Sequence, residues 1–377
     1  MTASYLDWNA TGKLRPQAHA AMLAALEVTG NPSSVHSAGR AARRLVEEAR
    51  ERVAALVGAS PREVVFTASG TEANMLALTP ALGDALLVSA IEHPSVRSGG
   101  RFPAVEEIAV TAEGVIDLAA LERRLGGCTR PLVSIMLANN ETGVIQPVAM
   151  AAAVVHSAGG LLHVDAVQGP GRIACDFNAL GADLMTLSAH KIGGPQGVGA
   201  LIRRDGLALP ALITGGGQER GARAGTENVA GIAGFGGAAH AAGCAVDEEA
   251  PRIAALRDQL EAGLRMLTPE VVIFGSTADR LPNTCLFAVP GMKAETAIIA
   301  LDLEGVAVSS GAACSSGKVA PSHVLAAMGV DPELCRSAIR VSLGYSTTDE
   351  DVEFILNAWG RLRERLYKAR KAHEIAA

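Results

Sequence analysis

Residues 161–191 contain two continuous apolar runs, Leu161-Leu162-His163-Val164-Asp165 and Leu184-Met185-Thr186-Leu187-Ser188, and each run ends in a polar side chain. Apolar runs of this length are typical of strands in a sheet that is covered on both faces. Four more runs of the same kind lie at residues 63–67, 85–89, 132–137 and 198–202. Helical patterns separate several of these runs, at residues 71–80, 117–125 and 147–158. This alternation predicts an α/β fold with a mostly parallel sheet sandwiched by helices.

The sequence outside this sheet divides the chain into two parts. An amphipathic helix is expected at residues 38–57, where apolar side chains recur three and four apart and Gly58 follows as a stop. A helix-rich segment at residues 248–266 is expected to join the parts, and a final helix is expected at residues 349–371. We therefore predict a large domain of residues 14–247 and a smaller α+β domain of residues 1–13 and 248–377.

The composition argues against several classes of protein. The 377 residues carry a net charge of −6, whereas a nucleic-acid-binding protein normally shows a basic face. Hydrophobic residues make up 49% of the chain, which is enough for a full core and argues against disorder. The six cysteines show neither a CxxC pair nor the spacing of a zinc site. The chain shows no apolar run that indicates a signal peptide or a membrane span, so we expect a cytoplasmic protein with reduced thiols.

Reactive side chains follow five of the predicted strands at the point where each strand ends. They lie in Ser69-Gly70-Thr71, in Glu92-His93, in Asn139-Asn140-Glu141, in Asp165 with Gln168, and in Ser188-Ala189-His190-Lys191. In open α/β sheets, ligands bind at the carboxyl ends of the strands. Five such endings at one edge are difficult to explain by packing alone, so the sequence predicts a ligand site there.

The segment Ser69-Gly70-Thr71 has two interpretations. A glycine turn at a helix N-terminus offers free backbone N–H groups and a positive dipole end, which suit a phosphate group. Alternatively, the segment is a simple helix start in which Ser69 or Thr71 is the N-cap. The pattern is neither GxGxxG nor a Walker loop, so it does not indicate a nucleotide.

Lys191 directly follows an apolar strand and precedes Gly193-Gly194-Pro195. A lysine in a partly desolvated site has a lowered pKa and becomes a Schiff-base nucleophile, although most lysines are exposed on loops. Asp165 ends a second strand, and pyridoxal 5′-phosphate (PLP) needs such a carboxylate beside its ring nitrogen. The pair indicates a PLP site.

A set of motifs along nearly the whole chain carries a family resemblance. They include Asn31-Pro32-Ser33-Ser34-Val35-His36, Thr71-Glu72-Ala73-Asn74, Asn139-Asn140-Glu141-Thr142-Gly143, His163-Val164-Asp165-Ala166-Val167-Gln168, Ser188-Ala189-His190-Lys191, Arg223-Ala224-Gly225-Thr226, Ser310-Gly311-Ala312-Ala313-Cys314 and Arg340-Val341-Ser342-Leu343-Gly344. In this order they resemble the motifs of cysteine desulfurases, which are PLP enzymes of fold type I in the class V aminotransferase group.

The resemblance implies a role for each residue of the cofactor site. Lys191 would bind PLP as a Schiff base, Asp165 would pair with the ring nitrogen, and Gln168 would contact the phenolic oxygen. His93 would stack on the ring and take part in proton transfer. The cofactor phosphate would be held by Gly70, Thr71, Ser188 and His190, and by Thr226 of a second subunit, which implies a homodimer.

Cys314 and two further residues define the reaction that the resemblance implies. Asn140 and Arg340 would hold the substrate, L-cysteine. Cys314 lies among small residues, which are typical of a loop, and the family places its nucleophile there. The sulfur would pass to Cys314 as a persulfide, L-alanine would leave, and an acceptor such as an iron–sulfur scaffold protein would take the sulfur. The other five cysteines are interpreted as small buried packing residues.

Two other classes of function stay open. Another PLP enzyme, such as an aminotransferase or a selenocysteine lyase, would share most of this site, but an aminotransferase needs no thiol at Cys314. A non-catalytic scaffold protein could keep the fold, but it would not need Lys191, Asp165, His93 and Cys314 together.

Overall fold

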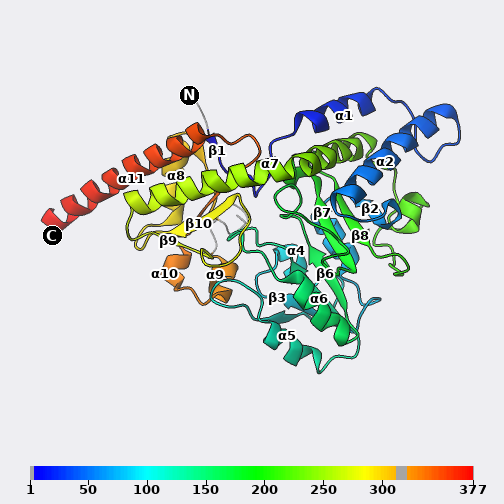
Figure 1. Ribbon diagram of the computed structural model, residues 1–377, viewed down its shortest axis with the longest axis horizontal. Coiled ribbons are helices and arrows are strands. Elements are labelled where there is room, and N and C mark those ends of the chain that lie inside the picture. Colours follow the sequence, from blue (N-terminus) through cyan, green and yellow to red (C-terminus); the bar gives the residue numbers. More distant parts are fainter. Residues whose placement is uncertain (1–3, 311–320, 377) are drawn as a thin grey trace.

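The computed structural model describes residues 4–310 and 321–376, with side chains given as far as Arg365. Its centre is a seven-stranded sheet with the order β2-β8-β7-β6-β5-β3-β4 (Figure 1). The strands are β2 (Val64–Thr67), β3 (Ala85–Ser89), β4 (Glu106–Ile108), β5 (Pro131–Met136), β6 (Leu161–Asp165), β7 (Leu184–Ser188) and β8 (Gly199–Arg203). Strands β3 to β7 run parallel, and β8 pairs antiparallel with both β7 and β2. The α/β fold with a mostly parallel sheet is therefore confirmed.

The six predicted strands of this sheet are confirmed within one residue at each end. Strand β4 was not expected, because it is only three residues long and begins with two exposed acidic side chains, Glu106 and Glu107. Since β8 is antiparallel to both neighbours, β2 points in the same direction as β7. The carboxyl ends of β2, β3, β5, β6 and β7 therefore meet at one edge, as the sequence predicts.

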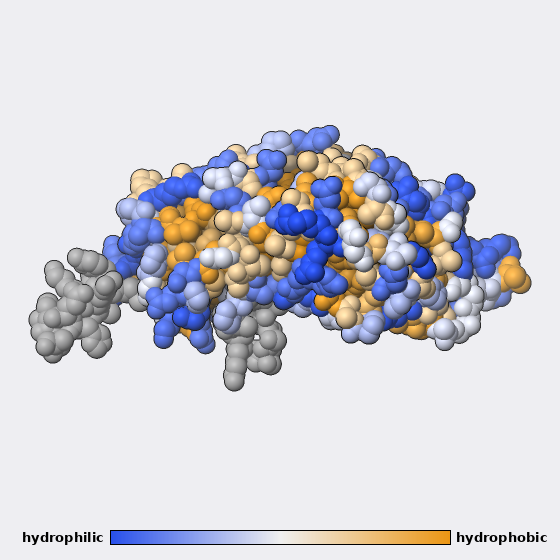
Figure 2. Space-filling model, turned by 90° about the horizontal axis from the view of Figure 1, so that it is seen from below, coloured by the Kyte–Doolittle hydropathy of each residue, from blue (hydrophilic) through white to orange (hydrophobic). Residues whose placement is uncertain are grey.

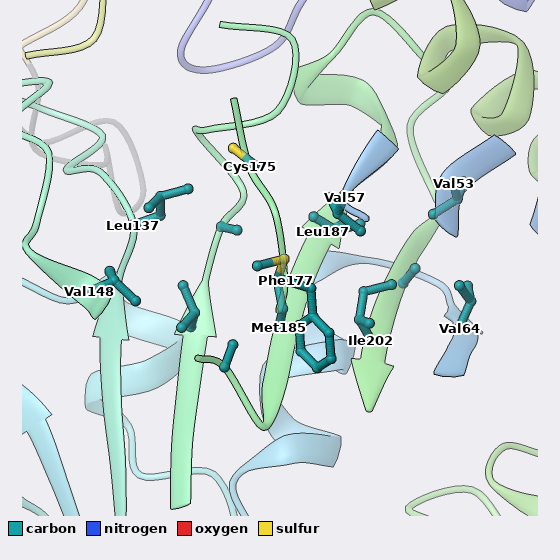
Figure 3. Close-up of a cluster of buried hydrophobic side chains, with 14 of the residues drawn as sticks. Val53, Val57, Val64, Leu137, Val148, Cys175, Phe177, Met185, Leu187 and Ile202 are labelled. Atoms are coloured by element: carbon teal, nitrogen blue, oxygen red, sulfur yellow. The ribbon is translucent and has the colours of Figure 1, made fainter. Parts of the chain in front are cut away.

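Successive residues of the strands pack into two different hydrophobic clusters, one on each face of the sheet. Leu87, Val133 and Ile202 belong to the cluster that α2, α5, α6 and α7 cover. Their neighbours in sequence, Leu86, Leu132 and Leu201, belong to the cluster that α3 covers. Figure 3 shows the first cluster, where Val53 of α2 and Val57, the residue after this helix, lie near side chains of β7 and β8. Burial on both faces explains why the strands are continuously apolar.

The helices of this part of the chain include those predicted at residues 38–57, 71–80, 117–125 and 147–158, each confirmed within three residues at either end, and two that were not predicted, at residues 16–26 and 94–97. In order, the helices are α1 (Pro16–Leu26), α2 (Ser37–Leu56), α3 (Gly70–Ala77), α4 (Pro94–Arg97), α5 (Leu118–Leu125), α6 (Val148–Ser157) and α7 (Val229–Leu267), with short 3₁₀ turns at η1 (Pro61–Glu63), η2 (Ala189–Lys191) and η3 (Gln218–Gly221). The sequence indicated only the second half of α7, at residues 248–266. Its first half is rich in glycine, which has a low helix propensity.

The glycines of α7 allow close contact with neighbouring helices. A Cβ atom added at Gly236 would lie 2.6 Å from the Cα atom of Ala49 in α2. A Cβ atom added at Gly237 would lie 2.8 Å from the carbonyl oxygen of Gln17 in α1. Packing against α1 and α2 therefore stabilises a helix that its own propensity does not favour.

Another hydrophobic cluster lies beyond the large sheet. It is built on β9 (Val272–Ile273), β10 (Thr284–Ala288) and β12 (Ile339–Ser342), with β1 (Ser4–Tyr5), β11 (Val306–Ala307), α8 (Ala294–Leu303) and α11 (Asp349–Ala376) around it. Leu6 of the N-terminal segment packs into this cluster with Trp359 of α11. Helices α9 (His323–Ala327) and α10 (Pro332–Cys335) pack into a separate cluster with alternate residues of β10. The predicted boundary at residue 247 falls inside α7, whose first half packs in the large part and whose second half packs with Leu6 and Trp359 (Figure 1). The division at this residue stays a prediction.

Helix α7 is also a candidate membrane span by length and composition, the only one among the helices that the structure describes. However, 61% of its most apolar window is buried inside the protein. The face drawn in Figure 2 mixes hydrophilic and hydrophobic residues. Burial among α1, α2 and the sheet therefore accounts for the apolar character of α7.

The five cysteines within the described residues are all free. Cys175, Cys285 and Cys335 are buried, as expected of packing residues. The packing prediction is wrong for Cys244, which is exposed, and only partly correct for Cys128, which is half-buried. Cys244 directly follows Gly243 near the middle of α7.

Candidate active site

A cavity of about 640 Å³ opens at the carboxyl edge of the large sheet. Ten of the predicted site residues line it: Gly70, Thr71, His93, Asn140, Asp165, Gln168, Ser188, His190, Lys191 and Arg340. They come from the ends of five strands of the large sheet and from β12 of the smaller part. The structure therefore brings together residues that lie up to 270 positions apart in the sequence.

Lys191 ends the short turn η2 that follows β7. Its Nζ atom donates hydrogen bonds to the carbonyl oxygens of Asn9, at 2.5 Å, and Ala10, at 2.9 Å. Burial, together with the nearby guanidinium groups of Arg340 and Arg172, lowers the pKa of Lys191 to about 7. A large fraction of this amine is therefore uncharged near neutral pH, which is the form that acts as a nucleophile or a base.

Asp165 ends β6 and is almost fully buried beside the cavity. Its Oδ1 atom accepts a hydrogen bond from the backbone N–H of Val167 at 3.1 Å, and its Oδ2 atom accepts one from Asn74 Nδ2 at 2.9 Å. These donors fix the orientation of the carboxylate. An ionised carboxylate at this place fits the protonated ring nitrogen of PLP.

The start of α3 fits a phosphate group. The Ser69 side chain is the N-cap and accepts the N–H of Glu72 at 3.1 Å, so the helix-start interpretation is confirmed and the phosphate interpretation stays a prediction. The first N–H groups of a helix have no partner within the helix, and Gly70 and Thr71 line the cavity. A Cβ atom added at Gly70 would lie 3.2 Å from Val167 Cγ2 and 3.5 Å from Ser188 Cβ. Glycine therefore keeps this cradle open.

His190 stands on the same side of the cavity, with its Nδ1 atom 3.0 Å from Thr11 Oγ1. Burial, together with the positive charges of Lys191 and Arg172, lowers the pKa of His190 to about 4. The ring is therefore neutral at neutral pH and can donate one N–H hydrogen bond.

The amide of Gln168 has a fixed orientation. Its Oε1 atom accepts a hydrogen bond from Nη1 of the buried Arg172, and its Nε2 atom donates to the carbonyl oxygen of Asn9 at 3.0 Å. One N–H of Nε2 is left for a further acceptor, since an amide nitrogen carries two. This donor fits the phenolic oxygen of PLP.

Arg340 on β12 is held at the opposite side of the cavity. Its Nη2 atom lies 2.6 Å from Asp7 Oδ1, and its Nη1 atom donates to the backbone oxygen of Asn140 at 2.9 Å. Its Nε atom is buried and takes no partner from the described residues. A carboxylate-bearing ligand would find a preformed guanidinium here.

Sequence reasoning missed the N-terminal segment of the site. Asp7, Asn9 and Ala10 line the cavity and bind Arg340, Gln168 and Lys191. These residues lie in an irregular stretch without periodicity, so no local pattern could have indicated them. The partner strand β11, which pairs with β1, lies some 300 residues away in the sequence.

Two further groups beside the cavity, Glu92 and His323, were given no role by sequence reasoning. Glu92 ends the loop after β3, accepts the Met136 N–H at 2.6 Å and is fully buried, which raises its pKa well above the ordinary value. His323 of α9 lines the cavity and bonds through Nε2 to the carbonyl oxygen of Glu92 at 3.0 Å. The position of Glu92 beside His93 was the available signal.

Two predicted residues are not among those that line the cavity. Thr226 is exposed in the loop before α7, so it does not contribute to the site of its own chain. Cys314 lies outside the described residues. Ser309 and Pro321, on either side of residues 311–320, both line the cavity.

Comparisons with known proteins agree with this geometry. The family model described as Aminotransferase class-V matches residues 4–355. A cysteine desulfurase of Gluconacetobacter diazotrophicus is 44% identical over 95% of this chain and 92% of its own length. The cysteine desulfurase IscS of Dictyoglomus turgidum is 41% identical over 96% of this chain and 95% of its own length.

A solved structure also superimposes on almost the whole chain. It is that of a NifS-like protein from Rickettsia africae, with 38% identity, a TM-score of 0.90, and coverage of 96% of this chain and 100% of that one. Sequence, fold and cavity therefore agree: the chain belongs to the class V aminotransferase family and, within it, to the PLP-dependent cysteine desulfurases.

Proposed function

We propose that the cavity removes the sulfur atom of L-cysteine and releases L-alanine, with Cys314 as the residue that receives the sulfur. The observation that carries this proposal is the amine of Lys191, which has a pKa of about 7 and shares one cavity with Asp165 and Arg340. Lys191 is suited to act as a base, Asp165 to pair with the cofactor, and Arg340 to bind the carboxylate of an amino-acid substrate.

PLP fits the residues present, through the open cradle at Gly70, the carboxylate of Asp165 and the remaining N–H of Gln168. When bound, PLP supplies an electron sink for the charge that remains when the substrate loses its Cα proton. Lys191 would attach the cofactor and then act as the base at the Cα atom. Asp165 would keep the ring nitrogen protonated, and the N-terminus of α3 would hold the phosphate with Ser188 and His190.

The sulfur step balances without an outside oxidant. The Cys314 thiolate attacks the substrate sulfur, an S–S bond forms, and the C–S bond of the substrate breaks. The electron pair of that bond stays with the carbon, which takes a proton and becomes the methyl group of alanine. The enzyme is left with a persulfide on Cys314, which a second thiol can take up.

We expect Arg340→Lys to raise the KM for L-cysteine by roughly 10- to 100-fold, because lysine cannot form the bidentate guanidinium–carboxylate pair, and a hydrogen bond to a charged group contributes about 1.5–3 kcal/mol. Steady-state kinetics on the PLP-loaded enzyme measures this change. Arg336→Lys, an exposed arginine of the same region, is the matched control and should leave the KM unchanged. An unaltered KM in Arg340→Lys would place the substrate carboxylate elsewhere.

The lowered pKa of Lys191 gives a pH dependence with a definite sign. The neutral amine attacks the PLP aldehyde, so uptake of PLP by the apoprotein should be fast and level above pH 7 and fall about tenfold per pH unit below it. Stopped-flow absorbance at a series of pH values measures this rate. A rate that keeps rising up to 10.5, the ordinary pKa of lysine, would show that the amine is not desolvated.

The assembly and the acceptor are further parts of the proposal. A homodimer would let the exposed Thr226 of one subunit reach the phosphate of the other. The persulfide sulfur would go to a cytoplasmic acceptor such as an iron–sulfur scaffold protein. Light scattering on the purified protein tests the dimer, and a loss of PLP affinity in Thr226→Ala would support the shared site.

The sulfur acceptor is tested by mass spectrometry. We expect the chain to gain one sulfur atom after incubation with L-cysteine in the absence of a reductant, and the peptide that contains Cys314 to carry it. Sulfur on another peptide, for example the one with the exposed Cys244, would contradict the assignment.

A further inference from the structure

A chain of hydrogen bonds joins Asp165 to His93 through two residues that the proposed reaction does not use. Asn74 of α3 donates from Nδ2 to Asp165 Oδ2 and to Ser95 Oγ, both at 2.9 Å. Ser95 of α4 places its Oγ atom 2.7 Å from His93 Nδ1. Asn74 is 1% exposed, and both Asn74 and Ser95 line the cavity.

The direction of each bond is fixed by the carboxylate. An ionised Asp165 only accepts hydrogen bonds, so Asn74 must turn its NH₂ group toward it. The second N–H of the same group then points to Ser95 Oγ. The Oδ1 atom of Asn74 stays buried without a partner among the described residues. The reverse orientation of the Asn74 amide is unfavourable, because it would place Oδ1 next to the Asp165 carboxylate and bring two acceptors together.

Two donors therefore meet the Nδ1 atom of His93. Since Ser95 Oγ accepts from Asn74, its own hydrogen is available for Nδ1 at 2.7 Å. The backbone N–H of Ser95 also donates to Nδ1, at 3.2 Å, because the His93 ring is the N-cap of α4. A nitrogen that accepts carries the lone pair, so the single proton of the neutral ring lies on Nε2.

The opposite edge of the ring faces the cavity. His93 lines the cavity, and within residues 4–310 and 321–365 no hydrogen bond to its Nε2 atom is found. Burial lowers the pKa of His93, Lys191 lowers it further, and Asp165 acts in the opposite direction. Among the described residues, His323 is a further titratable group that interacts electrostatically with the His93 ring. The ring is thus neutral, with an N–H directed at the ligand.

We propose that Asn74 and Ser95 are positioning residues that hold His93 as the Nε2–H tautomer, so that the ring donates a hydrogen bond to an acceptor atom of the substrate. If the proposed function is correct, that atom is the sulfur that leaves the substrate carbon, and the identity of the acceptor rests on that function. The tautomer itself rests only on the bonds of Ser95 and Asn74.

This assignment separates the tasks of the two bases in the cavity. With its proton on Nε2, His93 has no free lone pair toward the ligand and cannot accept a proton there. Lys191, whose neutral amine faces the same cavity, is then the group that takes up the Cα proton. His93 holds the sulfur in place for attack.

Nitrogen NMR on the PLP-loaded full chain with isotopically labelled histidine tests the tautomer directly. The His93 signals are identified by their loss in His93→Gln. We expect Nδ1 to be unprotonated and Nε2 to be protonated at neutral pH in the wild type. An Nδ1–H tautomer would overturn the inference, and this measurement needs no variant of Ser95.

A titration of the same signals tests the positioning role. Donors to the Nδ1 lone pair disfavour protonation, so Ser95→Ala should raise the pKa of His93 by about half to one pH unit. Ser95→Thr keeps the hydroxyl and should restore the wild-type pKa. Ser98→Ala removes another hydroxyl at the end of the same helix and should change nothing. An unchanged or lower pKa in Ser95→Ala would contradict the proposal.

A parallel assay separates this inference from the proposed function. If the wild type forms no alanine from L-cysteine but shows the Nε2–H tautomer, the function fails and the positioning network stands. If alanine is formed but His93 carries its proton on Nδ1, the function stands and the network fails.

Discussion

Lys191→Ala should lose covalent attachment of PLP, and its turnover of L-cysteine should fall by roughly a thousandfold or more. General acid–base groups alone contribute about 10²- to 10⁴-fold to a rate, and Lys191 is also the residue that attaches the cofactor. Its Nζ atom is the amine that the structure holds in the cavity with a pKa of about 7. Borohydride reduction followed by mass measurement detects the covalent PLP, and alanine formation gives the turnover.

Lys13→Ala is the matched control for this variant. Lys13 is exposed, and its Nζ atom lies 5.7 Å from the ring centre of Trp8, close to the site in sequence and space but outside the cavity lining. It should keep both PLP and activity. Full turnover in Lys191→Ala would refute its assignment as the cofactor lysine and base.

Cys314→Ala should bind PLP and L-cysteine normally but release no sulfide. Removal of a covalent nucleophile costs many orders of magnitude when the rest of the site cannot replace it, so we expect a loss of about 10³-fold or more. Binding of L-cysteine depends on Lys191 and Arg340, which the substitution leaves in place. The absorbance change on adding L-cysteine measures binding, and sulfide release in the presence of a reductant measures turnover.

Cys244→Ala serves as the control because Cys244 is the exposed thiol among the described cysteines. It should retain wild-type sulfide release. Sulfide release at the wild-type rate in Cys314→Ala would show that another group accepts the sulfur. A failure of Cys314→Ala to bind L-cysteine would instead place Cys314 in substrate binding.

The large sheet could be predicted because its strands are buried on both faces. Continuous runs such as Leu184–Ser188 leave a strong pattern, and the residues after them, such as Lys191, meet at one edge whenever strands run parallel. The glycine-rich start of α7 was missed because contacts with α1 and α2, and not helix propensity, stabilise it.

The rest of the site could not be predicted from local patterns. Asn9 is held by Thr284 and Asn283 of the smaller part, so its carbonyl oxygen reaches Lys191 only in the folded chain. The contact between Ser95 and Asn74 depends on how α3 and α4 pack, which no spacing in the sequence indicates. Motif resemblance supplied the roles of single residues, whereas the hydrogen-bond directions between them required the structure.

The account is tested most directly by the products formed from L-cysteine. The PLP-loaded wild-type enzyme is incubated with L-cysteine and a reductant, and alanine, sulfide and keto acid are measured in the same sample. Removal of sulfur from the substrate predicts alanine and sulfide in equal amounts over many turnovers, without keto acid. A keto acid in place of alanine, or alanine without sulfide, would contradict the central claim that this cavity is a cysteine desulfurase site.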